Sequence, residues 1–133
     1  MSSEINTARV FFTRVNLIAL VLSIIILILS LLSSPKAQTL FSIYAIILIV
    51  IILLGHLRVS RSSDLKQLGE RAVQTLWLWT SLGLVALTMP PTPYFEFDQL
   101  IMAAMITIGA ILIIAGVYAL LKIRKLTGVY LSV

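Results

Sequence analysis

Cysteine is absent from this chain of 133 residues, and charged residues are scarce. The lack of Cys excludes disulfides, thiolate metal sites and S-palmitoylation. Charged residues make up 11% of the chain and hydrophobic residues 60%, which lies outside the range of soluble globular domains. The composition therefore predicts a protein that is embedded in a lipid bilayer.

Four long stretches contain no Asp, Glu, Lys or Arg: Val15–Leu32, Leu40–Leu57, Val73–Met89 and Leu100–Leu121. A bilayer core is spanned by about 20 apolar residues of helix, within a range of about 17 to 25. Backbone groups in lipid must be paired within the segment, which favours helices, and the run Ile46 to Leu54 lacks the alternation of a barrel strand. We expect an all-α integral membrane protein, an up-down-up-down antiparallel bundle of four transmembrane helices.

The boundary signals divide a single domain, residues 1–133, into helices over about 10–32, 38–57, 65–89 and 98–126. Asp64 followed by Gln67 is typical of an N-cap and its partner at the third helical position, so the third helix should begin near Leu65. Pro90 should end that helix, and Asp98 should cap the fourth.

The basic residues give the orientation. Nine of the ten Lys and Arg fall on one side of the predicted spans, and Lys36 alone falls on the other; the nine are Arg9, Arg14, Arg58, Arg61, Lys66, Arg71, Lys122, Arg124 and Lys125. The positive-inside rule then places both termini in the cytoplasm of a cell, with the protein in a cell membrane (N-in/C-in). The excess charge of +5 is a topology signal that contacts lipid headgroups, and the chain offers no domain for nucleic acid.

Small and polar residues recur at helical spacing and predict helix-packing faces. One stripe joins Asn16, Ser23 and Ser30 in the first helix, and another joins Gln74, Ser81 and Thr88 in the third. In the fourth helix Gly109, Gly116 and Ala119 share a face on which a neighbouring backbone can approach closely. The alternative reading of the two polar stripes is a water-lined path or a substrate groove.

Few residues offer a binding site. His56, the only His, is a weak candidate for cofactor binding, because six-coordinate haem needs a second strong ligand and no second His is present. Glu96 and Asp98 are too few for a defined calcium site. We expect no metal and no intrinsic cofactor, while contact with lipid, quinone or pigment stays open. The aromatic residues, Trp77 and Trp79 in the third helix and Tyr94, Phe95 and Phe97 in the following loop, are interpreted as belts at the membrane surfaces.

No nucleophile stands beside a candidate base and no acid pair lies within the spans, so we expect no enzyme and no catalytic residues. Coupled transporters usually keep an ionisable residue inside the membrane, and these spans have only the terminal His56. Two classes of function remain. The first is a non-catalytic accessory subunit that packs against other membrane protein subunits of a respiratory, oxidase or photosynthetic complex. The alternative is a small homo-oligomeric channel, transporter or holin-like pore.

Overall fold

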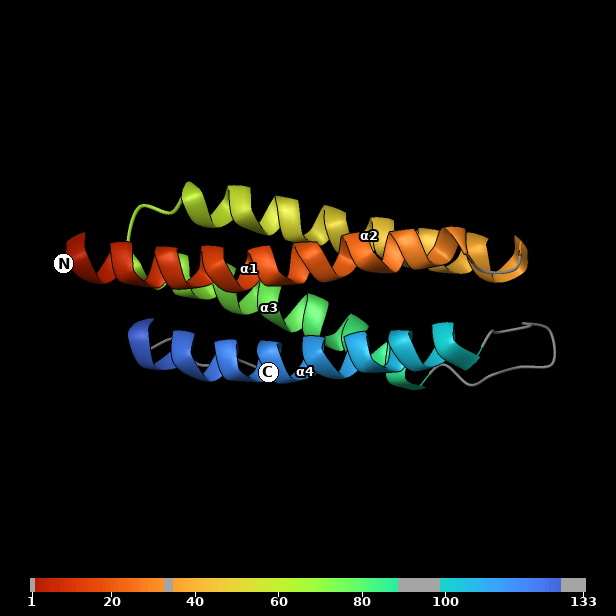
Figure 1. Cartoon of the computed structure of the whole chain (residues 1–133). Coiled ribbons are helices and arrows are strands. Elements are labelled where there is room, and N and C mark those ends of the chain that lie inside the picture. Colours follow the sequence, from red (N-terminus) through yellow and green to blue (C-terminus); the bar gives the residue numbers. More distant parts are fainter. Residues whose placement is uncertain (1, 33–34, 89–98, 128–133) are drawn as a thin grey trace.

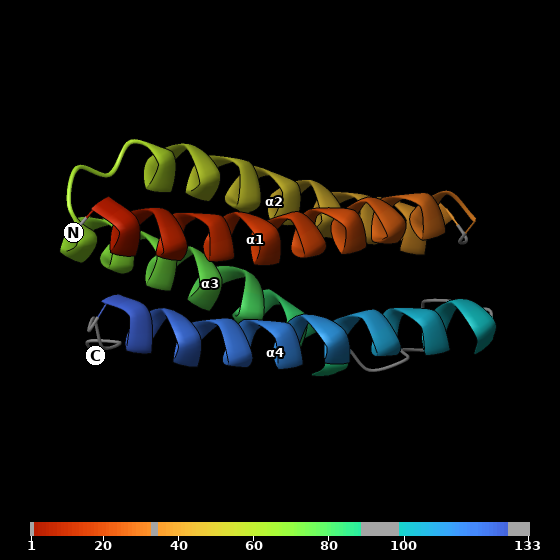
Figure 2. The ribbon, with the colours of Figure 1, turned by 60° about the vertical axis from the view of Figure 1, so that its left-hand side comes forward.

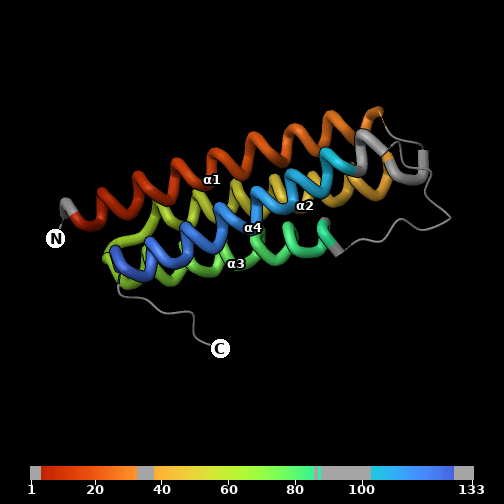
Figure 3. Tube along the Cα trace, turned by 60° about the horizontal axis from the view of Figure 1, so that its bottom comes forward, coloured from red at the N-terminus to blue at the C-terminus, as the bar shows by residue number. Residues whose placement is uncertain are grey.

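The computed structural model describes residues 2–32, 35–88 and 99–127, and in this part the chain is all-helical. Its four helices are α1 (Ser2–Leu31), α2 (Pro35–Ser60), α3 (Leu65–Thr88) and α4 (Gln99–Thr127). They lie side by side in one bundle, with α1 and α3 running one way and α2 and α4 the other (Figures 1 and 3). The start of α1 and the end of α4 consequently lie at the same end of the bundle.

Three helices are long and apolar enough to cross a membrane: α1 over Glu4–Leu31, α2 over Gln38–Ser60 and α4 over Ala103–Thr127. The chain is therefore a multi-pass membrane protein by length and composition. Helix α3 does not reach the same mean hydropathy, because its 24 residues include the charged Lys66, Glu70 and Arg71 beside several polar side chains. The expectation of four spans is met by three of the four helices.

Helix α1 begins at Ser2, earlier than the expected start near residue 10. The reason is that its buried face continues toward the N-terminus, where Ala8 and Phe12 are fully enclosed by neighbouring helices. Burial of this face stabilises helical turns that the span itself does not require. The ends of α2 and α4 lie within three residues of the expected ones.

The start of α3 at Leu65 confirms the predicted boundary. The backbone N–H of Gln67 donates to Asp64 Oδ1 at 2.7 Å, as the capping pattern requires. The Gln67 side chain differs slightly from the expected box, since its Oε1 accepts from the N–H of Ser63 at 2.8 Å rather than from that of Asp64. The predicted end of α3 at Met89 and the Asp98 cap lie outside the described residues.

The helices form a ring in the order α1, α2, α3, α4, in which each helix touches the next and α4 touches α1. Helix α3 also touches α1 across the ring, and it runs obliquely from beside the end of α2 toward the start of α4 (Figures 1 and 2). Large apolar side chains fill the interior; among the fully buried are Phe12, Ile26, Leu48, Ile52, Leu68, Leu76, Trp79, Leu112 and Ile123. In the described part of the chain α2 and α4 are kept apart by this packing.

Candidate functional site

The polar stripe of α1 lies inside the bundle. Asn16 is 3% exposed, and Ser23 and Ser30 are fully buried. The Asn16 amide Nδ2 donates to the carbonyl of Ile52 in α2 at 2.9 Å. The Ser30 hydroxyl donates to Leu27 O at 2.6 Å and lies 3.0 Å from the Ser42 hydroxyl of α2. These side-chain contacts link α1 to α2 at two levels along the bundle.

Ser23 lies between those two interhelical contacts, and its hydroxyl donates to Ala19 O of its own helix at 2.8 Å. Such a bond satisfies a hydroxyl in an apolar interior without a partner from another helix. All three residues of the α1 stripe are thus buried in the bundle, and Asn16 and Ser30 also contact α2 through their side chains.

The polar stripe of α3 differs from the expectation of a packing face. Gln74 is exposed, and its Oε1 accepts from Arg58 of α2 at 3.1 Å. Ser81 is half-buried and donates to Trp77 O at 2.8 Å, within its own helix. The Thr88 side chain lies outside the described residues. Positions seven residues apart stay near one face of a helix, and the face of α3 that is buried in the bundle is a different one, which carries Val73, Leu76 and Trp79.

The small residues of α4 face α3. A Cβ built on Gly83 of α3 would stand 3.0 Å from Leu112 Cβ and 3.3 Å from the carbonyl oxygen of Gly109. A Cβ built on Gly116 would stand 2.9 Å from Thr80 Cβ and collide with the Thr80 hydroxyl. Ala119, one turn further along α4, is fully buried. The close approach on this face therefore lies within the bundle, between α3 and α4.

Two interhelical contacts carry no signal at helical spacing, and sequence reasoning missed them. Gly55 of α2 lies so close to Thr75 of α3 that a Cβ would stand 2.8 Å from Thr75 Cβ. The Tyr44 hydroxyl of α2 donates to the carbonyl of Leu82 in α3. Gly55 and Tyr44 lie at opposite ends of the α2–α3 contact, so together they fix the crossing of the two helices.

One end of the bundle, called here the basic end, carries the nine cationic residues that the sequence groups together. Arg9 of α1 donates to Ser62 O at 3.2 Å, and Arg71 of α3 donates to Arg58 O at 2.8 Å. The Lys122 ammonium of α4 lies 4.6 Å from the centre of the Phe11 ring, a favourable cation–π geometry. The cations thus bind helix-end carbonyls and a ring as well as defining a charged surface.

The weak cofactor candidate His56 lies exposed near the basic end, on the wall of a pocket of roughly 280 Å³ between α1 and α2. The pocket is lined by Thr13, Asn16, Leu17, Leu20, Ile52, Leu53 and His56. Among the described residues no group of three His, Cys, Asp or Glu side chains comes together as a metal site. The structure therefore places His56 in a groove with polar and apolar neighbours.

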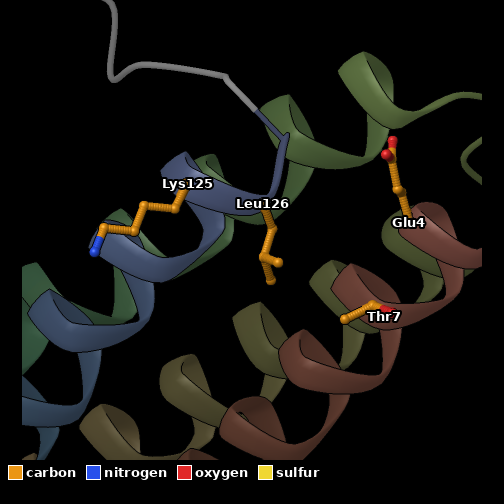
Figure 4. A pocket seen from close by; sticks show the side chains of 4 residues that line it. All are labelled: Glu4, Thr7, Lys125 and Leu126. Carbon is orange, nitrogen blue, oxygen red and sulfur yellow. The ribbon is translucent and has the colours of Figure 1, made fainter.

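A second pocket, of roughly 300 Å³, lies at the basic end between the start of α1 and the end of α4. Glu4 and Thr7 line one side, and Lys125 and Leu126 line the other (Figure 4). The Glu4 carboxylate and the Lys125 ammonium point apart, and Leu126 alone reaches into the gap from α4 (Figure 4). The charged groups do not converge on a common point.

The aromatic interpretation needs one correction. Trp79 is 0% exposed and belongs to the core, whereas a belt residue meets the lipid surface. Trp77, two residues earlier, is half-exposed on the outside of α3. A helix turns by about 100° per residue, so residues two apart point to opposite sides. Tyr94, Phe95, Phe97, Glu96 and Asp98 lie outside the described residues.

Comparison with protein-family models, with curated proteins and with solved structures finds no match for this chain.

Proposed function

We propose that the chain is a non-catalytic accessory subunit of a larger integral membrane complex, for example a respiratory, oxidase or photosynthetic complex, which it stabilises by helix packing. One observation carries the proposal. The polar stripe of α1, which a water path would need, is buried and bonded within the bundle through Asn16, Ser23 and Ser30. A role in helix packing is compatible with this burial and bonding and needs no rearrangement of the stripe.

The membrane arrangement that accompanies this proposal has four spans, with both termini in the cytoplasm. Its support is the basic end, where the positive-inside rule favours the cytoplasmic surface. Helix α3 lies along α4 and between α2 and α4, so a bilayer crossed by its neighbours encloses α3 as well.

The outer surface supplies the docking faces that an accessory subunit needs. On α2 it presents Ile47, Val50 and Leu54, and on α4 it presents Ile114, Val117 and Leu121, all exposed and all apolar. Helices associate in lipid through close van der Waals packing. A partner subunit can therefore pack on either face without having to satisfy a buried charge.

The experiment is purification of the tagged chain from its own membrane in mild detergent, followed by native mass spectrometry. We expect stoichiometric association with larger, cofactor-bearing chains. To locate the docking face, Ile47, Val50 and Leu54 are replaced together by Ala in one variant. A second variant replaces Ile114, Val117 and Leu121, which have the same spacing on α4, so that the two candidate faces are compared directly.

Loss of the partner from one triple variant, with helical content unchanged, would establish a specific docking face on that helix. A preparation that contains this chain alone, as a homo-oligomer, would refute the accessory-subunit proposal.

The second candidate is a homo-oligomeric pore, and the observation that favours it is the polar stripe of α3. Gln74 is exposed and Ser81 half-buried on that helix, so several copies could turn these residues toward a shared path. Ser81→Ala and Gln74→Leu would then change ion or solute flux in vesicles. Ser23→Ala is the matched control, because Ser23 is fully buried inside one copy and cannot line such a path.

A further inference from the structure

Helix α3 has two faces that differ in what covers them. The side chains that face the bundle are buried, and they include Leu68, Ala72, Val73, Thr75, Leu76, Trp79 and Thr80. Those of the opposite face are exposed or half-buried, and we call five of them the outer seam of α3: Glu70, Gln74, Trp77, Ser81 and Leu84. Figure 3 shows α3 along one edge of the bundle, where no other described helix covers this seam.

The spacing of the outer seam is that of a contact between two long helices. Its members follow one another at intervals of four, three, four and three residues, which is the a/d pattern of a coiled coil. Gln74 and Ser81 occupy a positions, and Glu70, Trp77 and Leu84 occupy d positions. A second helix can therefore lie along the exposed length of α3.

The chemistry of the seam is unlike that of the lipid-facing helices. The exposed residues of α1 from Leu17 to Leu31 are all Leu, Ile or Val, and so are those of α2 from Ile43 to Leu54. The seam of α3 carries instead a carboxylate, an amide and a hydroxyl. Polar groups without hydrogen-bond partners are costly in apolar surroundings. The seam thus matches a protein surface better than it matches lipid tails.

Two polar groups of the seam have unused bonding capacity. The Gln74 Oε1 accepts from Arg58 at 3.1 Å, and no described residue accepts from the NH₂ group of the same amide. The Glu70 carboxylate forms no ion pair in the described part of the chain. Both side chains are exposed, so a neighbouring helix can reach them directly.

A second copy of this chain supplies the partners that these groups lack. Copies inserted in one orientation are related by a twofold axis along the membrane normal, so each seam residue lies opposite the same residue. An amide donates and accepts, and its oxygen has two lone pairs, so two Gln74 side chains can bond to each other while each still accepts from Arg58. The small Ser81 permits close approach at the next a position.

The charges at the basic end of the seam fit the same arrangement. Glu70 is followed by Arg71, which occupies the flanking e position of the heptad. In a parallel pair of helices a residue at d contacts the e position of the other helix. Each Glu70 carboxylate therefore lies beside the Arg71 guanidinium of the second copy, which offsets the repulsion between the two carboxylates.

We propose that the outer seam of α3 is the interface of a homodimer, in which the α3 helices of two copies pack in parallel with Gln74 and Ser81 at the axis. Trp77 and Leu84 supply the apolar contacts between them. The inference does not depend on the accessory role. It rests on the four-span arrangement proposed above, which inserts both copies in the same orientation. In the pore considered above these residues would line water, whereas here they meet directly.

The first test is disulfide cross-linking in the native membrane, because an introduced Cys is the only thiol of the chain. Ser81→Cys is nearly isosteric, and the seam brings the two Cα atoms within the reach of a disulfide, about 4.4–6.8 Å. A copper–phenanthroline oxidant takes up two electrons while the two thiols lose their protons and form one S–S bond. We expect a cross-linked species of twice the mass of the chain.

Ile114→Cys on α4 is the matched control. It lies at the same level of the bundle, since Gly83 packs against Leu112 and Thr80 packs against Gly116. Ile114 is 69% exposed and Ser81 is half-buried. Random collision would cross-link Ile114→Cys at least as readily as Ser81→Cys, whereas the seam favours Ser81→Cys alone.

The second test measures the amide pair. Gln74→Leu should weaken dimerisation about tenfold, as the loss of two interhelical hydrogen bonds in lipid predicts. Energy transfer between copies labelled at their N-termini measures this as the protein is diluted with lipid in vesicles. Thr107→Val is the matched control, because Thr107 is exposed on α4 and the change also removes a polar group from the outer surface.

Cross-linking of Ser81→Cys above Ile114→Cys, with weaker association of Gln74→Leu alone, would establish the seam. Equal cross-linking of the two Cys variants would overturn it. So would a cross-link from Ser81→Cys to a different protein, or an assembly of more than two copies that conducts. A monomer that still co-purifies with larger chains would overturn the dimer and keep the accessory role, and a dimer without larger chains would do the reverse.

Discussion

Gly116 of α4 lies directly against the side chain of Thr80 of α3, so closely that a Cβ at position 116 would stand 2.9 Å from Thr80 Cβ. Real Cβ atoms essentially never come within 3.0 Å of an atom from another part of the chain. The most extensive interhelical contact of the bundle, between α3 and α4, therefore leaves no room for a side chain at position 116.

Replacing Gly116 with Ala should lower the free energy of unfolding by about 1–3 kcal/mol, because the added methyl group overpacks this contact. Unfolding by SDS titration in mixed micelles measures the change. Thr80→Ala in the same chain should recover part of the loss, since the Thr80 hydroxyl is the closest atom. Ile114→Ala, at a position 69% exposed on the same helix, should cost much less.

The Thr80 hydroxyl itself is buried without a hydrogen-bond partner. Thr80→Val keeps the shape of the side chain and removes the unpaired oxygen, so it should raise the free energy of unfolding by about 1 kcal/mol. The control is Thr75→Val on the same helix, where the hydroxyl donates to Arg71 O at 3.0 Å. An equal gain at both positions would show that the lack of a partner at Thr80 has no energetic consequence.

The Tyr44 hydroxyl joins α2 to the Leu82 carbonyl of α3, and Tyr44→Phe removes only that oxygen. We expect a loss of about 0.5–1.5 kcal/mol in the free energy of unfolding. Tyr118→Phe is the comparison, because Tyr118 is exposed on α4 and its ring contact with Phe11, at 6.1 Å between centroids, survives the change. If the two variants unfold alike, the α2–α3 hydrogen bond contributes nothing measurable.

The absence of Cys makes orientation directly measurable, since any single introduced Cys is the only thiol in the chain. Ser63→Cys and Lys125→Cys, both at the basic end, should react with a membrane-impermeant maleimide only after the cytoplasmic side is exposed. Lys36→Cys, at the opposite end of α2, should react in intact cells. The reverse pattern would show that the basic end faces outward and that the positive-inside rule fails here.

The groove at Asn16 illustrates how far sequence reasoning reaches into the candidate site. The spacing of Asn16, Ser23 and Ser30 predicted a shared face on α1, and all three are buried. The same reasoning failed at Gln74, which is exposed. Both stripes have the same seven-residue spacing, so spacing alone could not tell a stripe that faces the interior of the bundle from one that faces outward.

His56 shows the same limit for binding. In the sequence it was only a weak candidate for cofactor binding, because no second strong ligand accompanies it. Only the fold brings it into one groove with Thr13 and Asn16. The residues come from positions about forty apart in the chain, on two helices whose register the sequence left open.

The sequence by itself determined the class of protein and its helices. Long uncharged stretches, scarce charge and capping residues are local features, and in lipid they leave the backbone no alternative to helices. The tertiary structure alone decided which faces meet: that Trp79 belongs to the core, that Gly116 packs against Thr80, and that Asn16 is buried between α1 and α2. The physical reason is that helices in a membrane are apolar on every side, so hydrophobicity cannot select the packed face, and close steric fit between particular side chains selects it instead.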